Sequence, residues 1–422
     1  MSALESMIAS APGGEAPMMQ ALSFELPAPS TAIVDRKQAC RAYPSSASSL
    51  TVDGTKTVRI RLGGEDFVDP SSLRVMFSIR NTGTGALRTQ TGAWGVWQQA
   101  FLRSNGVELD NIPYYGRFHH QYGYAQLSWE DQMAVGNEGL GASRVQANSQ
   151  FDHHDIAAGK SMTVMHRLHF SLLNSGKLLP LKYAPLEIEL SMVNSALDWV
   201  SAESGFTQAF ALENIQILYD AYTLDEAVQA SFYKALLMNR VLSIPLLTTY
   251  QFNVPIPAGA TTFSFSSVRA FSRLSQIWLT FRKDLGRNYS FICPGPLPGD
   301  TDVNTLGIEN SAVPQARLSI GPKNWPDPSP ATTSAEYHYL LTKALGYSPN
   351  INRKCFEESA FTIVWDLKKN PGDATSAIST RSGDLVRIDL TNLVADAATE
   401  CWLTMIAFGV CAVRESGVTL LT

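Results

Sequence analysis

Hydrophobic and polar residues alternate with a period of two along much of this chain. Residues 58–62 (VRIRL) are apolar at every second position and carry arginines between, which is the pattern of a β-strand with one buried face. The same alternation recurs at residues 75–79, 186–190 and 215–219. Turn-forming pairs such as Gly63-Gly64 separate these runs. The pattern predicts an all-β protein built from short antiparallel strands.

Two short segments depart from this alternation and predict helices. Residues 223–226 (TLDE) have the form of a capping box that begins at Thr223. The apolar residues that follow share one helical face; they are Val228, Phe232, Ala235 and Leu236. A shorter helix is predicted to start at residues 128–131 (SWED). The longer helix lies near the middle of the chain, where a connector between two β domains would be placed.

The strand pattern of the first half starts again in the second half. Residues 262–266 alternate, and residues 277–281 follow after a gap like the one between the first two strands. A Ser-Gly pair precedes both LEIEL at 186–190 and LVRIDL at 385–390. Because these segments keep their order at offsets of about 200 residues, we infer two copies of one domain. Eight or so short strands in each copy favour an antiparallel jelly roll.

The chain is therefore expected to contain two tandem eight-stranded jelly rolls with short helices in the loops and the connector. The expected parts are a flexible N-terminal arm at 1–22, a first barrel at 23–223, a connector helix at 224–240 and a second barrel at 241–422. The arm is rich in small residues without a period. Prolines and glycines at 286–349 predict a long surface loop on the second barrel, and 104–160 is a comparable irregular region in the first.

Composition and charge agree with two globular domains and limit the classes of partner that we expect. The chain has 422 residues, of which 45% are hydrophobic and 17% charged. Its formal net charge is −5, and residues 1–35 contain no lysine or arginine. A surface that neutralises nucleic-acid phosphate is not expected from this balance.

The cysteines and the apolar stretches point to a reduced protein without a targeting segment. Five cysteines are scattered without a CxxC pair, at Cys40, Cys293, Cys355, Cys401 and Cys411. We expect reduced, mostly buried thiols. Residues 1–20 lack the basic and apolar regions of a signal peptide, and the apolar stretch at 402–413 is too short to span a bilayer.

Two doubled histidines are the most suggestive chemical feature. They are His119-His120 in FHHQYGY and His153-His154 in FDHHDI. One ligand from each pair, with Asp152 or Asp155 as a third, would suit a divalent metal. Neighbouring residues of a strand point to opposite faces, however, so an extended segment cannot direct both members of a pair at one ion.

Two further observations weigh against that metal site. The HxH spacing that would place two ligands on one strand face is absent, and His166 and His169 have odd spacing. The interpretation favoured here is histidines that are solvated or that pack within loops, with no metal, catalytic or cofactor-binding residue and no cofactor. The segment 151–156 is also a hypothetical pH-sensitive loop, because histidine protonates near pH 6.5.

The motifs of common enzyme classes are missing. The chain contains no GxSxG, HExxH or GxxxxGK[ST] sequence. Carboxylates such as Glu357, Glu358 and Asp366 would suit glycoside hydrolysis, but the sequence fixes no distance between them.

Aromatic residues are concentrated in one stretch of the first half. The set is Trp94, Trp97, Phe101, Tyr114, Tyr115, Phe118, Tyr122, Tyr124 and Trp129. Three roles are open: a loop packed on its own barrel, a contact surface for other subunits, or a carbohydrate-binding cleft.

The order of these features resembles a known family. VRIRLGGEDFVDPSSLRVMFSIRN followed by WGVWQQAFLRSNGVELDNIPYYGRFHHQY resembles the first barrel of double jelly-roll major capsid proteins of double-stranded DNA viruses. ENIQILYDAYTLDEAV is similar to the inter-barrel connector, and FSSVRAFSRLSQIWLTFRK and SGDLVRIDL look like strands of the second barrel. The resemblance covers about residues 50–421 and includes no active site. The chain is shorter than many members.

The resemblance implies a structural protein of the virion that is made and assembled inside the host cell. Three chains would form a trimeric, pseudo-hexameric capsomer that tiles an icosahedral shell. Its implied partners are other copies of itself, minor capsid or penton proteins, and an internal membrane reached through the N-terminal arm, without sequence-specific nucleic-acid binding. Two alternatives remain open: a glycan-active enzyme built on paired jelly rolls, and a receptor-binding spike.

Overall fold

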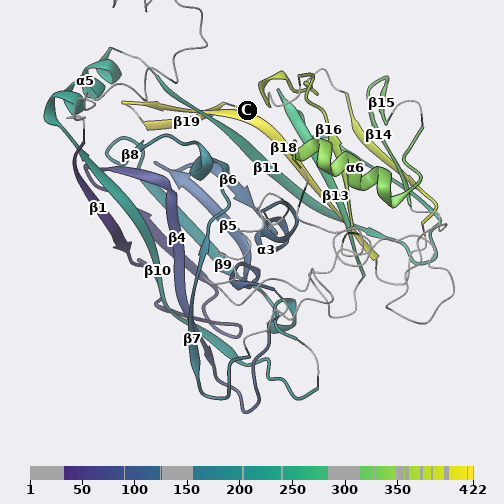
Figure 1. Cartoon of the computed structure of the whole chain (residues 1–422), viewed down its shortest axis with the longest axis horizontal. Helices are drawn as coiled ribbons and strands as arrows, with labels where there is room; N and C mark the ends of the chain where they lie inside the picture. Colours follow the sequence, from purple (N-terminus) through teal and green to yellow (C-terminus); the bar gives the residue numbers. More distant parts are fainter. Residues whose placement is uncertain are drawn as a thin grey trace, which may run out of the picture.

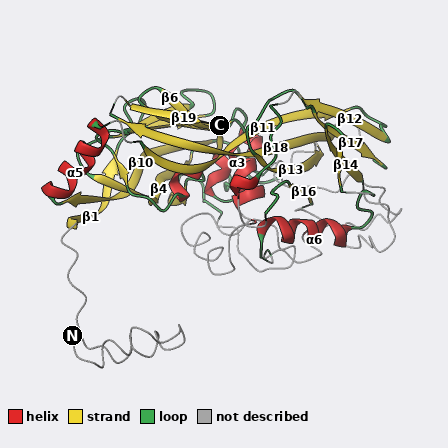
Figure 2. Ribbon diagram, turned by 90° about the horizontal axis from the view of Figure 1, so that it is seen from above, coloured by secondary structure: helices red, strands yellow, loops and turns green. Residues whose placement is uncertain are grey.

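The chain folds as two β-barrels that lie side by side (Figures 1 and 2). The structure is a computed structural model. It describes residues 33–89, 91–123, 125, 155–201, 204–238, 241–283, 314–326, 329–347, 349, 356, 361–370, 374–381, 384–393, 399–415 and 417–421.

The first barrel consists of two antiparallel sheets. One sheet has the order β1-β10-β4-β7, with β2 beside β10 and β8 beside β4, and the other has the order β3-β9-β5-β6. The strands are β1 (Ile33–Ala42), β2 (Ser49–Thr51), β3 (Thr57–Leu62), β4 (Phe67–Asn81), β5 (Trp97–Ser104), β6 (Val107–Ile112), β7 (Ser161–Arg167), β8 (Leu179–Pro180), β9 (Leu186–Met192) and β10 (Phe210–Leu224).

The second barrel repeats this arrangement. Its sheets have the orders β11-β18-β13-β16, with β19 beside β18, and β12-β17-β14-β15. The strands are β11 (Leu242–Ile256), β12 (Thr262–Ser267), β13 (Leu274–Lys283), β14 (Gln315–Ile320), β15 (Lys323–Trp325), β16 (Thr362–Asp366), β17 (Val386–Thr391), β18 (Thr399–Arg414) and β19 (Gly417–Leu421).

Both halves have the strand order of a jelly roll. Without the small strands β2, β8 and β19, each barrel has eight described strands. When these are numbered 1 to 8 along the chain, the strand order in both barrels is 1-8-3-6 in one sheet and 2-7-4-5 in the other. The segments matched by sequence occupy equivalent places: β3 and β12 are second strands, β4 and β13 third, and β9 and β17 seventh. The inferred duplication and the two tandem jelly rolls are confirmed.

Alternation explains which face each strand buries. In β3, Val58, Ile60 and Leu62 are buried while the arginines between them face solvent, so apolar side chains line the barrel and charged ones keep their hydration. The strand β10 changes phase at Asn214, whose positive φ of 54° accompanies a β-bulge against β4. Its burial pattern is therefore not a simple alternation over its whole length.

The connector between the barrels is α5 (Glu226–Leu237). Of its predicted apolar face, Leu236 is buried and Phe232 contacts Phe67 of the first barrel, with ring centroids 5.7 Å apart. The capping prediction was wrong by two residues. Asp225 is the N-cap and accepts from the backbone of Ala227, whereas Thr223 belongs to β10.

The region expected to be a long loop at 286–349 contains regular structure. It includes β14, β15 and the helix α6 (Ser334–Leu345), which lies against β16, and residues 284–313 are outside the described part. The other region expected to be irregular, 104–160, contains β6 and two helical turns, α3 (Tyr115–Phe118) and the π-helix η2 (His119–Gly123). The helix predicted at 128–131 lies outside the described residues.

Short 3-10 turns complete the described structure: η1 (Ala93–Val96), η3 (Ser171–Asn174), η4 (Ala196–Asp198) and η5 (Ala374–Ser376). No helix among the described residues has the length and apolar character needed to cross a bilayer.

Candidate functional site: the junction between the barrels

The predicted histidine segment forms the centre of the contact between the two barrels. The turns α3 and η2 follow β6 and lie between the barrels (Figure 1). From sequence alone, FHHQYGY is compatible with an extended segment or a loop; the structure has helical turns there, which place His119 and His120 inside the protein, at 5% and 6% exposure.

His119 belongs to a buried cluster of rings on the first-barrel side. Its imidazole stacks on Trp94, with centroids 4.6 Å apart and planes 18° apart. The rings of His166 and His169 lie edge-on at 6.3 Å and 5.7 Å. Helical turns and a strand thus bring together three histidines that their sequence spacing did not connect.

The tautomer of His166 follows from its hydrogen bonds. The Nε1–H of Trp97 donates to His166 Nε2 over 2.8 Å, so that nitrogen has a free lone pair and no proton. The proton is then on Nδ1, which lies 3.1 Å from the carbonyl oxygen of Arg167. Both ring nitrogens are occupied, so His166 is not available as a metal ligand.

Burial holds these histidines in the neutral form. Desolvation lowers the pKa of His166 and His169 to about 4 and that of His119 well below 6.5. Positive charge nearby acts in the same direction: Arg74 lowers the pKa of His166, and Arg167 that of His169. The cluster is a packing feature that stays uncharged at neutral pH.

The other proposed site residues are dispersed. Asp155 forms a two-pronged ion pair with Arg88 at 2.7 Å and 2.9 Å, and Asp366 lies 3.5 Å from Lys368. Asp152, His153 and His154 lie outside the described residues, as do Glu357 and Glu358. The described part of the chain contains no group of three histidine, cysteine or carboxylate side chains placed to hold a metal ion.

The cysteines that the structure describes are free thiols. Cys401 and Cys411 are buried in β18, and desolvation raises the pKa of Cys411 to about 11. Cys40 is partly exposed, while Cys293 and Cys355 lie outside the described residues.

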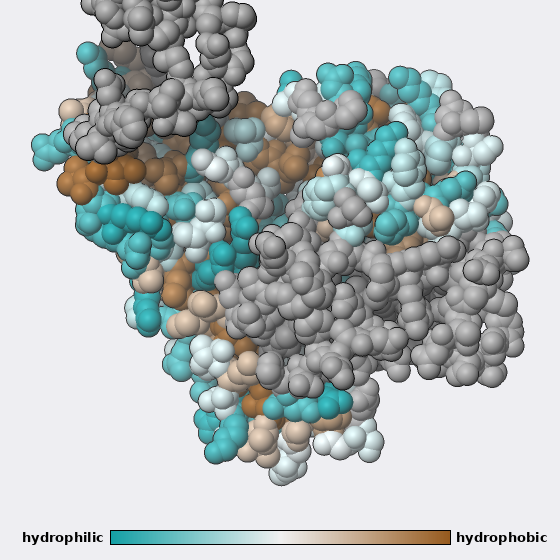
Figure 3. All heavy atoms as spheres, viewed as in Figure 1, coloured by the Kyte–Doolittle hydropathy of each residue, from teal (hydrophilic) through white to brown (hydrophobic). Residues whose placement is uncertain are grey.

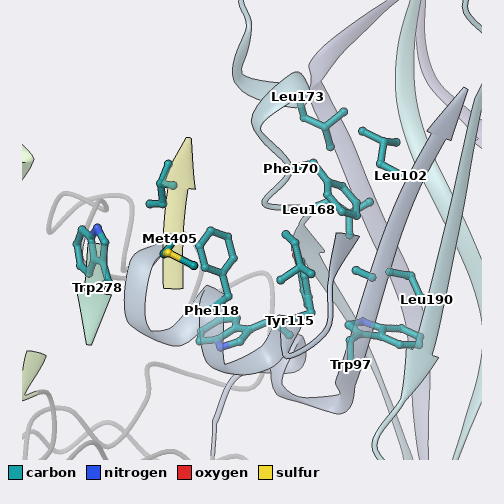
Figure 4. Packing of buried hydrophobic residues seen from close by; sticks show 14 of the residues in the cluster. Trp97, Leu102, Tyr115, Phe118, Leu168, Phe170, Leu173, Leu190, Trp278 and Met405 are labelled. Carbon is teal, nitrogen blue, oxygen red and sulfur yellow. The ribbon is translucent and has the colours of Figure 1, made fainter. Parts of the chain in front are cut away.

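Aromatic residues of the first barrel continue from the core into the junction. Figure 4 shows Phe118 between Tyr115 on one side and Met405 and Trp278 of the second barrel on the other. The ring of Tyr122 meets Trp278 edge-on, at a centroid distance of 5.1 Å. Such contacts are worth about 0.5–1.5 kcal/mol beyond area burial.

Tyr114 fastens the same segment to two strands of the second barrel. Its backbone N–H donates to Gln251 Oε1 over 3.2 Å, and its hydroxyl donates to Asn253 Oδ1 over 3.4 Å. Its ring also meets Trp402 edge-on at 4.3 Å, while the guanidinium of Arg117 lies 4.4 Å from the same indole.

A buried carboxyl group forms another polar link across the junction. Asp110, on β6, accepts from the backbone N–H groups of Asn111 and Thr249, and Thr249 lies on β11. Burial raises the pKa of Asp110 to about 7. The Oγ of Ser171 also accepts from the backbone N–H of Leu247.

Two cavities flank the helical turns at the junction. The first has a volume of about 370 Å³ and a mainly apolar lining that includes Phe118, Leu246 and Phe408. The second, of about 190 Å³, is lined mostly by polar side chains of both barrels, among them Asp198 and Glu400.

The structure thus gives the aromatic-rich stretch a role within one chain. Trp94, Trp97, Tyr115 and Phe118 are buried, and Tyr114 and Tyr122 contact the second barrel. Of the three roles left open by the sequence, these six residues fill the first and extend it to the neighbouring barrel. Trp278 and Trp402 were missed because strand alternation gives no signal of which barrel faces which.

Comparisons with known proteins connect this fold with viral capsids. No family model matches the sequence, and no curated protein matches it. VP54 of PBCV-1, in a structure fitted into a reconstruction of the virophage Sputnik, has a TM-score of 0.66 at 10% identity and covers 94% of this chain and 98% of that one.

Two further solved structures are similar. The Faustovirus major capsid protein has a TM-score of 0.57 at 9% identity, with 98% of this chain and 95% of that chain covered. A chain of the Sputnik virophage structure has a TM-score of 0.59 at 8% identity, with 94% and 90% covered. The fold is thus that of double jelly-roll capsid proteins over nearly the whole chain.

Proposed function

We propose that this chain is the major capsid protein of a double-stranded DNA virus and that three copies form one pseudo-hexameric capsomer. The observation that carries the proposal is the repeated strand order, 1-8-3-6 and 2-7-4-5, in two barrels that are joined side by side. Three such chains present six similar barrels. A ring of six can meet six neighbours in a hexagonal lattice although only three chains form it.

The junction supports this role because a shell subunit must hold its two barrels in a fixed relation. Rings from the first barrel contact Trp278 and Trp402 of the second, and the hydrogen bonds of Tyr114 add directional contacts on β11. A contact that combines aromatic packing with hydrogen bonds disfavours hinge motion between barrels.

We further propose that the end of the molecule carrying α5 faces the inside of the shell. Large apolar side chains are exposed there: Ile33 and Val34 at the start of β1, and Leu237 and Met238 at the end of α5. Hydrophobic atoms are visible in this part of the surface (Figure 3). Exposed apolar groups favour contact with a protein or lipid surface, so minor capsid or penton proteins, or an internal membrane reached through residues 1–22, are the proposed partners.

The proposed division of the chain follows from this role. Residues 1–22 are the arm, 23–223 the first barrel, 224–240 the connector and 241–422 the second barrel. The described strands and α5 lie within these bounds, except that β10 ends at Leu224, one residue inside the connector. We place the protein in the virion after assembly in the host cell. Its net charge of −5 supports a shell that does not bind the genome by neutralising its phosphates.

Sedimentation velocity and negative-stain electron microscopy of the expressed protein test the proposal. We expect particles of about three times the chain mass of 46.1 kDa with a hexagonal outline. A protein that stayed monomeric at high concentration would contradict it, and a trimer that never tiles would favour the receptor-binding spike. A glycan-release assay addresses the enzyme alternative, and no turnover is expected.

A further inference from the structure

We infer that the outer face of the sheet β1-β10-β4-β7 binds the end of α6 of the next chain in the capsomer, and that this contact repeats the junction found inside one chain. The inference rests on the proposed function, because it names the two surfaces that meet when three chains form a ring. It is carried by two equivalent barrel faces, of which the chain covers one and leaves the other open.

The third strands of the two barrels align position by position. Residues 75–80 (VMFSIR) lie in β4 and residues 277–282 (IWLTFR) lie in β13. In both runs the first, third and fifth residues point into the barrel and are 0% exposed. The second residues, Met76 and Trp278, therefore lie on the outer face, and each is paired with the eighth strand of its barrel, β10 or β18.

In the second barrel this outer face is covered by the first barrel. Trp278 is 0% exposed, and its ring meets that of Tyr122 at the end of η2. On the neighbouring strand β11, Gln251 accepts a hydrogen bond from the backbone of Tyr114. The covering turns α3 and η2 belong to the connection between the fifth and sixth strands of the first barrel, β6 and β7.

In the first barrel the equivalent face is open. Met76 is partly exposed, whereas its counterpart Trp278 is fully covered. A groove of about 550 Å³ lies on this face, and its lining includes Met76, Ser78 and Tyr43, which is 64% exposed. Pockets of roughly 300–1,000 Å³ hold drug-sized ligands, so the groove has room for a large side chain from another chain.

The second barrel has a free segment that matches this groove. Its own connection between the fifth and sixth strands, β15 and β16, contains α6. The helix ends at Gly346, and Tyr347 follows it with 44% of its surface exposed. Tyr347 thus corresponds to Tyr122, the tyrosine at the end of the helical turns in the first barrel. Tyrosine is enriched at protein interfaces because it combines a large apolar ring with a hydrogen-bonding hydroxyl.

The two open surfaces differ from each other, as a closed ring of identical chains requires. A contact between different faces of identical chains generates a ring when the rotation between neighbours closes. In Figure 2, α6 and β1 both lie along the lower side of the two barrels, toward opposite ends. One third of a turn about an axis on that side directs α6 of one chain toward the first barrel of the next. Contacts within and between chains then share one geometry.

Photocrosslinking of the assembled protein tests which surfaces meet. Incorporation of p-benzoylphenylalanine in place of Tyr347 puts a photoreactive group at the end of α6. After irradiation we expect covalent dimers and trimers on denaturing gels. Mass spectrometry of mixed isotope-labelled and unlabelled chains should place the crosslinks between chains, at groove residues such as Tyr43 and Met76. Crosslinks confined to one chain, or to other surfaces of the next chain, would overturn the inference.

Tyr43→Lys tests the groove from the other side. It adds a second cation to a lining that already contains Arg41, and the parent side chain is 64% exposed in the single chain, so the variant should fold. Burial of this charge at the contact predicts that the protein concentration giving half trimer rises by about tenfold or more. Sedimentation velocity over a dilution series measures that concentration.

Val268→Lys is the matched control. Val268 is 86% exposed, follows β12 on the second barrel and also precedes an arginine, Arg269, but it belongs to neither proposed surface. The control should trimerise at the same concentration as the parent. Equal concentrations for the parent and Tyr43→Lys would also overturn the inference.

The outcomes distinguish this inference from the proposed function. A parent protein that stays monomeric contradicts the proposed function and removes both. Trimers whose crosslinks lie elsewhere contradict only the assignment of the two surfaces and leave the capsid role standing.

Discussion

Single buried residues at the junction connect the stability of this protein with pH. His166 is neutral and engaged at both ring nitrogens, and its pKa is lowered to about 4. Asp110 has the opposite perturbation, with a pKa raised to about 7. Each group is held in its uncharged form because burial removes the water that would solvate its charge.

We predict that the free energy of unfolding falls as pH is lowered from about 6.5 to 4. In this range the unfolded chain protonates His119, His166 and His169 while the folded chain keeps all three neutral, so acid favours the unfolded state by more than Asp110 alone offsets. A pKa of about 4 against about 6.5 in the unfolded chain corresponds to about 3 kcal/mol. Urea unfolding at a series of pH values measures the slope.

Asp110 opposes this trend in the same window, because the folded state holds its proton up to about pH 7 while the unfolded chain releases it near pH 4. Substitution of each residue separately therefore distinguishes the contribution of His166 to the pH dependence of stability from that of Asp110. His166→Gln, which keeps an acceptor for Trp97, should flatten the pH dependence, and Asp110→Asn should make it steeper. Identical slopes in the parent and His166→Gln would disprove the assignment.

Among the elements, α6 shows how a helix forms in a segment that looks irregular by composition. Thr333 and Glu336 make a reciprocal capping box, and Gly346 ends the helix with a left-handed φ of 79°. The hydroxyl of Tyr337 accepts from Ala316 N and donates to Pro314 O. The helix thereby holds the start of β14 in the barrel.

We predict that Thr333→Ala lowers the free energy of unfolding by about 1 kcal/mol, the usual effect of losing an N-cap side chain. The physical reason is that the backbone N–H of Glu336 loses its acceptor, the Thr333 hydroxyl. Urea denaturation measures the change. Thr333→Ser retains the hydroxyl and is expected to stay close to the parent; equal losses in both variants would argue against capping as the cause.

At the scale of the whole molecule, the junction decides whether the chain behaves as one unit or two. Tyr114 and Tyr122 connect the first barrel with Trp402 and Trp278 of the second. Each barrel has its own two sheets, so each is capable in principle of unfolding separately. Cooperative unfolding of both depends on the free energy of their contact.

We predict that Tyr114→Ala combined with Tyr122→Ala separates one calorimetric transition into two. Loss of both aromatic contacts should weaken the coupling by about 2–5 kcal/mol, from ring contacts and vacated volume. Scanning calorimetry detects the split. Tyr339→Ala, which removes a side chain on α6 that is 64% exposed, is the control. A single unchanged transition in the double variant would show that other contacts dominate.

Much of the fold could be predicted because a strand with one buried face shows an alternation of apolar and polar residues in its own sequence. The alternation at Val58 and Ile60 specifies a strand and its buried face without reference to any partner, and repetition of the pattern about 200 residues later specifies a second barrel. The N-cap of α5 was misplaced because Thr223 and Asp225 both suit a cap; the continuation of β10 to Leu224 leaves Asp225 in that position.

The sequence by itself determined the class of fold, its duplication and the connector, because each depends on periodicity among neighbouring residues. Only the tertiary structure decided that His119 stacks on Trp94 beside His166, and that Asp198 and Glu400 line one cavity. These pairings join residues from different elements and, in the cavity, from different barrels. Their geometry depends on how two barrels pack, which no local pattern encodes.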